Sequence, residues 1–187
     1  MKTRSSLIEF WRALLLLTLV GAALVLISWT GRSPNVTTVL LVRHAEKDTL
    51  RTDPPLSPSG KERAMSLAHV LRDAGVVAIY ATQYVRTQQT VKPLAEGLAV
   101  HIEVVNADPQ NLKGHAEALV KGVMSGHSGG VVLISSHSNV IPLIIRALGV
   151  SAAPEISDDE YDNLFVVTKH TSGEVKLLRL KYGKPAR

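Results

Sequence analysis

Residues 37–47, TTVLLVRHAEK, contain the run that decides the fold. Its first six residues are β-branched or apolar, which is typical of a strand buried on both faces. Strands of this kind occur in α/β domains, where helices cover both sides of the sheet. The run ends on Arg43 and His44, a permanent cation and a titratable ring. They mark either a strand end that enters solvent or the floor of a site.

Beyond this run, strand-like and helix-like segments alternate along the chain. The patterns predict strands over 37–42, 76–82, 100–105 and 130–136, helices over 58–74, 85–96, 111–124 and 138–149, and a terminal hairpin over 163–180. Ser57 is the expected N-cap of the first helix, and Pro93 is expected to kink or shorten the second. The alternation predicts an α/β fold with a mainly parallel sheet covered on both faces, and antiparallel pairing at one edge.

The first 32 residues differ in composition from the rest. Residues 13–31 carry no charge, and nineteen helical residues span about 28 Å, close to the thickness of a bilayer core. Three of the four basic residues here precede this run, so the positive-inside rule places the N-terminus in the cytoplasm. We expect residues 1–32 to be a cytoplasmic tip with an uncleaved signal anchor, and residues 33–187 to be an extracytoplasmic domain. The alternative is a secreted domain after signal cleavage, although LISWTGRSP offers a poor cleavage site.

The charge and composition of the chain exclude some classes of function. The net charge of +5 falls to +2 when the first 32 residues are set aside, and only 4% of residues are aromatic. Without a basic stripe, nucleic-acid binding is not expected. The absence of cysteine excludes disulfides and thiolate chemistry.

Charged and titratable residues follow three of the predicted strands. Arg43 and His44 come after the first, Arg86 shortly after the second, and His137 after the fourth. Because ligands of open α/β sheets bind at the carboxyl ends of the strands, we expect these residues to meet there.

Two arginines and two histidines suit phosphoryl transfer. Guanidinium groups match phosphate oxygens, and a neutral imidazole can attack phosphorus and hold the phosphoryl group covalently. A helix that starts near Ser138 would add backbone N–H donors. Catalysis of this kind is mainly electrostatic, so no metal is required.

Three segments, VRHAEK (42–47), YATQYVRTQQT (80–90) and ISSHSNVIP (134–142), resemble the histidine phosphatase superfamily, also called the phosphoglycerate mutase-like family. Ala45 stands where that family has glycine. The resemblance extends over about residues 37–182. It implies a three-layer α/β/α sandwich and a metal-independent phosphoric monoester hydrolase of the histidine acid phosphatase type, without a cofactor.

The resemblance also implies roles for individual residues. His44 would be the nucleophile that becomes phosphohistidine, while Arg43, Arg86 and His137 would bind the phosphoryl oxygens. Ser138 is expected mainly to cap a helix, with substrate contact as a second role. Glu46 is either a substrate contact or a partner in a loop salt bridge.

The residue that would act as general acid is not part of the three motifs. Asp108, just after the third predicted strand, is the first choice, because a carboxylic acid near the phosphate can protonate the leaving group. The other histidines are interpreted as surface residues, and the acidic run 157–162 as a solvated loop. Two alternatives stay open: a non-catalytic module that binds phosphorylated ligands, and a protein-phosphohistidine phosphatase. The substrate and the oligomeric state are not predicted.

Overall fold

The computed structural model describes residues 36–49 and 52–185, which belong to one compact unit, Pro34–Arg187. No helix within these described ranges is long and apolar enough to cross a bilayer. The segment 13–31, predicted to be a membrane anchor, lies outside the described residues.

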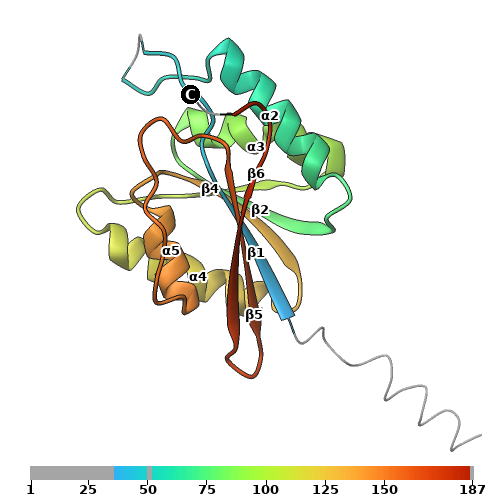
Figure 1. Cartoon of the computed structure of the whole chain (residues 1–187), viewed down its shortest axis with the longest axis vertical. Helices are drawn as coiled ribbons and strands as arrows, with labels where there is room; N and C mark the ends of the chain where they lie inside the picture. Colours follow the sequence, from blue (N-terminus) through green and yellow to red (C-terminus); the bar gives the residue numbers. More distant parts are fainter. Residues whose placement is uncertain (1–35, 50–51, 186–187) are drawn as a thin grey trace, which may run out of the picture. The chain divides into compact units, whose positions relative to one another are not determined.

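Strands and helices alternate along the described chain (Figure 1). In order, they are β1 (Val36–Arg43), α2 (Pro58–Leu71), β2 (Val76–Thr82), α3 (Val85–Leu98), β3 (Ile102–Val105), α4 (Leu112–Gly126), β4 (Val131–Ser136), α5 (Ile141–Leu148), β5 (Asn163–His170) and β6 (Val175–Lys181). This order confirms the α/β fold that the sequence predicts, and each predicted strand is present.

One mixed sheet contains all six of these strands, in the order β3-β2-β4-β1-β5-β6. Strands β3, β2, β4 and β1 are parallel, whereas β5 pairs antiparallel with both β1 and β6. The terminal hairpin therefore adds the predicted antiparallel edge. In the register, Arg43 of β1 lies opposite Ser136 of β4, and Ser135 lies opposite Ala81 of β2. The carboxyl ends of these three strands consequently meet at one edge of the sheet.

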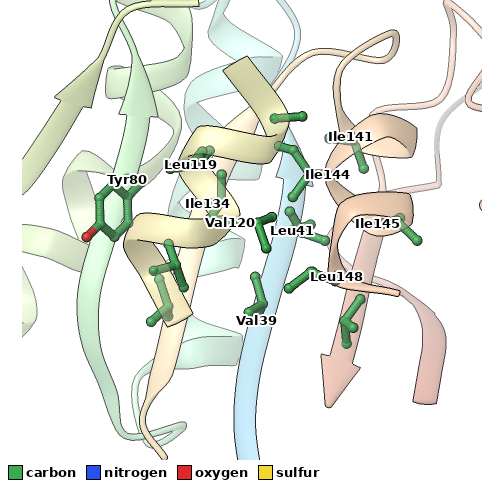
Figure 2. Close-up of a cluster of buried hydrophobic side chains, with 14 of the residues drawn as sticks. Val39, Leu41, Tyr80, Leu119, Val120, Ile134, Ile141, Ile144, Ile145 and Leu148 are labelled. Atoms are coloured by element: carbon green, nitrogen blue, oxygen red, sulfur yellow. The ribbon is translucent and has the colours of Figure 1, made fainter. Parts of the chain in front are cut away.

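Helices cover both faces of the sheet, which gives the three layers. Helices α4 and α5 pack over a cluster that includes Leu41, Ile134 and Ile144 (Figure 2). Helices α2 and α3 cover the opposite face, over a cluster that includes Val42 and Leu133. Leu41 and Val42 are neighbours in β1 and point to opposite faces, because side chains alternate along a strand. Both are completely buried, which explains the continuous apolar run in the sequence.

Helix α2 begins against the loop that follows β1. Ser57 is its N-cap, as predicted, and its Oγ accepts a hydrogen bond from the Gly60 amide at 3.2 Å. The Ser57 amide donates to the Glu46 carbonyl at 2.9 Å. The same carbonyl lies so close to Gly60 that a Cβ at this position would overlap it. Backbone contacts thus fix the start of α2 against Glu46, which is two residues beyond His44.

Helix α3 is longer than the sequence predicts. It continues through Pro93 to Leu98, and Ala99 then ends it in the left-handed region with φ of 54°. Proline removes one backbone hydrogen bond. Val91 and Leu94, on either side of Pro93, are buried against the sheet, and this packing keeps the helix continuous.

Helix α5 begins later than the sequence predicts, at Ile141. A turn precedes it, in which the amides of Val140 and Ile141 both donate to the His137 carbonyl at 3.0 Å. Pro142 lies in the first turn of the helix, where the missing N–H costs no helical bond. The helix N-terminus is therefore displaced from the position near Ser138 that the sequence predicts.

Candidate active site

A cavity of about 310 Å³ opens where β1, β2 and β4 end. Its lining includes His44, Arg86, His137 and Ser138, four of the predicted site residues. Arg43 precedes His44 and lies close enough to both histidines to lower their pKa values. The structure thus brings together residues that are far apart in the sequence.

His44 is held at the end of β1 with one ring nitrogen engaged. Its amide donates to the Ser136 carbonyl at 2.9 Å, and its side chain is buried. The ring Nδ1 lies 2.8 Å from the Ala45 carbonyl oxygen. A carbonyl can only accept, so Nδ1 carries the proton of the neutral ring and Nε2 keeps its lone pair. Nε2 has no hydrogen-bond partner within residues 36–49 and 52–185, so it is the nitrogen free to react.

Both histidines of the cavity are neutral near pH 7. Burial lowers the pKa of His44 from 6.5 to about 3; His137, Arg86 and Arg43 act in the same direction, and the Ala45 carbonyl opposes them. Burial also lowers the pKa of His137, to about 4, with added effects of Arg86, Arg43 and His115, while Asp53 acts in the opposite direction. A neutral imidazole is the form that can attack phosphorus.

A chain of hydroxyl groups sets the orientation of His137. Thr82 Oγ1 lies 3.0 Å from His137 Nε2 and 2.9 Å from Thr87 Oγ1. Thr87 Oγ1 donates to the Tyr84 carbonyl at 2.7 Å, so it accepts from Thr82. Thr82 then accepts from His137 Nε2–H. The neutral His137 ring is thereby left with its lone pair on Nδ1.

Arg43 is held by backbone oxygens of the loop before β5. Its Nη1 donates to the carbonyls of Ser157 and Asp158 at 2.9 and 2.8 Å. Its guanidinium carbon lies 4.1 Å from the centre of the Tyr161 ring. Its Nε is buried and has no hydrogen-bond partner in the described part of the chain. This donor therefore lacks, in the described chain, the partner that a bound anion could supply.

Arg86, in the first turn of α3, is held in a similar way. Its Nη1 lies 3.2 Å from Asp53 Oδ1, and its guanidinium carbon lies 4.4 Å from the centre of the Tyr84 ring. Its Nε is likewise buried and unpaired among the residues described. Because a buried donor without a partner is costly, the two Nε–H groups indicate a site that an anion completes.

The other three predicted site residues, Ser138, Glu46 and Asp108, do not lie in the same surroundings. Ser138 lines the cavity beside His137. Glu46 instead forms a two-point salt bridge with Arg63, at 2.7 and 2.9 Å, and lines a separate cavity of about 510 Å³. Burial acts to raise the pKa of Glu46, but the hydrogen bonds from Arg63 outweigh it and hold this pKa below its usual range. Asp108 is exposed, and its Oδ1 accepts from the Gln110 amide at 2.9 Å within its own turn.

Several residues of the site were not predicted. Tyr84 lies within a quoted motif, but nothing in its spacing indicated a contact with Arg86. Tyr161 belongs to the acidic run that was interpreted as solvated, yet this loop holds Arg43. His115, interpreted as a surface residue, is half-buried, and its Nε2 is buried without a partner in the described chain. Asp53 had no signal beyond its place in a proline-rich loop.

The described residues contain no group of three or more histidine, aspartate or glutamate side chains that could hold a metal ion. This finding includes the described acidic run 157–162, which contacts Arg43 through backbone carbonyls and through the Tyr161 ring.

The sequence of this chain matches one family of known proteins over part of its length. A family model described as histidine phosphatase superfamily (branch 1) matches residues 39–107. The matched segment contains Arg43, His44 and Arg86, whereas His137 lies beyond it. The match confirms the resemblance to this superfamily that the sequence motifs indicate. The comparison with curated proteins finds no significant match.

Solved structures share the fold at low sequence identity. A mycobacterial glucosyl-3-phosphoglycerate phosphatase is 14% identical, with a TM-score of 0.65 over 79% of this chain and 100% of the other. A phosphoglycerate mutase from Bacillus anthracis is 15% identical, with a TM-score of 0.63 over 79% and 94%. A protein from Nakamurella multipartitia, proposed to be the phosphohistidine phosphatase SixA, is 19% identical, with a TM-score of 0.61 over 82% and 100%. These likenesses show the common architecture, and the named activities belong to those proteins.

Proposed function

We propose that this protein is a metal-independent phosphatase that hydrolyses a phosphomonoester through a phosphohistidine intermediate on His44. One observation carries the proposal: the unprotonated Nε2 of His44 lines a cavity beside two arginines whose buried Nε–H groups lack partners in the described chain. Nε2 attacks phosphorus while Arg43 and Arg86 neutralise the phosphoryl oxygens. The Nδ1–H bond to Ala45 stabilises the imidazolium that forms on phosphorylation. Water then releases phosphate and restores the ring.

His137 and Ser138 complete the proposed phosphoryl site. The Nδ1 of His137 can accept a hydrogen bond from a protonated phosphoryl oxygen, since Thr82 keeps the ring proton on Nε2. Ser138 follows directly and supplies a hydroxyl donor at the same wall of the cavity. The charge needed for the transition state thus comes from side chains, and the proposed reaction uses no metal or organic cofactor.

The direct test is phosphate release from p-nitrophenyl phosphate by the full chain in detergent solution. We expect wild-type turnover, an acid-labile phosphohistidine adduct, and loss of both in His44→Ala. His101→Ala is the matched control, because His101 is exposed and lies outside the cavity; it should retain activity. Binding of phosphate or vanadate by wild type without turnover of any phosphate ester would contradict the enzyme and favour a binding module.

A protein-phosphohistidine phosphatase is the second candidate, supported by the structural likeness to the Nakamurella protein. An activity panel that contains both a phosphohistidine peptide and small phosphate esters distinguishes the two candidate activities.

For localisation, we propose that residues 13–31 anchor the protein in a membrane with the domain outside the cytoplasm, supported by their uncharged composition and the basic residues before them.

A further inference from the structure

The loop that follows the first motif returns to the start of α3 at Asp53. Its base is closed by a bridge between Lys47 and Leu56 and by a hydrogen bond of 2.9 Å from the Asp48 amide to the Pro55 carbonyl. The Leu56 amide donates to Gln89 Oε1 of α3 at 2.8 Å. The loop is therefore attached to α3 on the side of Arg86.

Asp53 contacts the first turn of α3 through both carboxylate oxygens. Oδ1 lies 3.2 Å from Arg86 Nη1, and Oδ2 accepts from the Val85 amide at 3.1 Å. The side chain is 39% exposed, so it lies at the rim of the site and keeps access to solvent. It is also close enough to His137 to affect that ring electrostatically.

The other carboxylates that the sequence suggested are engaged elsewhere. Asp108 accepts a hydrogen bond within its own turn, and Glu46 is paired with Arg63. Among the residues described, Asp53 is the one acidic side chain in an ion pair with Arg43 or Arg86. The neighbours of Asp108, Ala107 and Pro109, line the cavity, but Asp53 is the carboxylate that is tied directly to a predicted phosphate-binding arginine.

We propose that Asp53, rather than Asp108, is the acid–base residue of the reaction, protonating the leaving group and then deprotonating the attacking water. This inference rests on the proposed function. It assigns Asp53 the two roles that a carboxylate at the rim can fill in succession, once as an acid and once as a base. The ion pair with Arg86 holds its carboxylate beside a side chain that is proposed to bind the phosphoryl oxygens.

In the proposed reaction, Asp53 begins and ends as a carboxylate, and each proton is accounted for. The phosphomonoester binds as its monoanion and passes its proton to Asp53. His44 Nε2 then forms a bond to phosphorus as the ester P–O bond breaks, and Asp53 gives the proton to the departing oxygen, which leaves as the alcohol. In the second step, water attacks phosphorus, the N–P bond returns its electron pair to Nε2, and Asp53 takes the water proton. That proton leaves with dihydrogen phosphate.

The test compares leaving groups in Asp53→Asn, measured on the full chain in detergent solution. Asparagine keeps one acceptor oxygen, enough for Val85 or Arg86 but not for both, and it cannot carry the proton. We expect kcat for an alkyl phosphate to fall about 100-fold or more, within the usual range for a lost general acid. For 2,4-dinitrophenyl phosphate, whose leaving group needs no proton, formation of the phosphohistidine should be nearly unchanged. The adduct should accumulate, because its hydrolysis has lost the base.

Two further variants, Asp73→Asn and Asp108→Asn, show whether the effect is specific to Asp53. Asp73→Asn is the matched control, because Asp73 is exposed between α2 and β2, at the opposite edge of the sheet; it should behave as wild type with both esters. An equal loss with both leaving groups in Asp53→Asn, together with weaker vanadate binding, would show that Asp53 only positions Arg86, and would overturn the inference.

Asp108→Asn decides between the two carboxylates. A loss confined to the alkyl phosphate in this variant, with Asp53→Asn unaffected, would also overturn the inference. If wild type turned over neither ester, the proposed function itself would fail. Failure of the inference alone is recognised by an active wild type and an unselective Asp53→Asn.

Discussion

At the residue scale, the two arginines share one arrangement. Each is held through Nη1 by acceptors from a loop, each packs against a tyrosine ring, and each has a buried Nε without a partner in the described chain. Arg43 and Arg86 thus lose side-chain freedom before any ligand binds, which reduces the entropy cost of binding an anion. A lysine could not replace either, because an ammonium group has no second edge to offer.

The lowered pKa values of His44 and His137 predict acid sensitivity. Below pH 6.5, the unfolded chain takes up protons that these rings, with pKa values of about 3 and 4, do not bind when folded. Their contribution to stability is therefore complete above pH 6.5 and is lost as pH falls toward 4. We expect a loss on the order of a few kcal/mol from the two rings together.

Thermal unfolding of the full chain, followed by circular dichroism between pH 7 and pH 4, measures this effect. His137→Asn should show a smaller decrease in Tm over this range than wild type. His101→Asn, which changes an exposed ring, should keep the wild-type slope. Identical slopes in all three proteins would contradict the prediction.

At the element scale, backbone contacts join α2 to the first motif. The Glu46 carbonyl accepts from Ser57 and lies against Gly60, so the helix start and the loop after His44 form one unit. The start of α5 has a comparable role, since the turn before Ile141 folds back on the His137 carbonyl. Elements on opposite faces of the sheet therefore fix the two histidines.

Two glycine substitutions test the contact at α2. Gly60→Ala should lower stability by roughly 1–3 kcal/mol, because the new Cβ overlaps a backbone oxygen that cannot move freely. Gly97→Ala is the matched control, since Gly97 is exposed in α3 with open space around its Cα. It should raise stability by about 0.5–1 kcal/mol through helix propensity. Thermal unfolding of both variants measures the difference, and equal effects would argue against the contact.

At the scale of the whole molecule, the sheet order brings the site together. Strands β2, β4 and β1 are neighbours, although β4 follows β1 by almost ninety residues in the chain. Two buried clusters on opposite faces hold these strands in register. The edge that carries the candidate site therefore depends on both helical layers.

The proposed anchor also belongs to this scale. We expect the full chain to sediment with membranes and to be released by detergent but not by alkaline carbonate, because nineteen uncharged residues bury apolar surface in the bilayer. A chain without residues 1–33 should stay in the soluble fraction. A reporter fused to the C-terminus, active only outside the cytoplasm, tests the orientation. Release of the full chain by carbonate would contradict the anchor.

The sequence by itself determined the local features. Hydrophobic periodicity depends on neighbouring residues, and it correctly predicted the strands, the α/β class and the hairpin. The motif residues Arg43, His44, Arg86 and His137 were predicted because parallel strands place their carboxyl ends at one edge. Helix boundaries were less accurate at α3 and α5, where burial and a turn, rather than propensity, decide the ends.

Tertiary structure decided which atoms of the site are available. Arg43 meets the Ser157 carbonyl across 114 residues, and Asp53 meets Arg86 across 33. Neither contact leaves a local pattern, since a backbone carbonyl has no sequence identity and a single aspartate before two prolines is common in loops. The free Nε edges, the ring tautomers and the carboxylate at the rim are products of long-range packing. The proposed reaction depends on these features more than on the motifs.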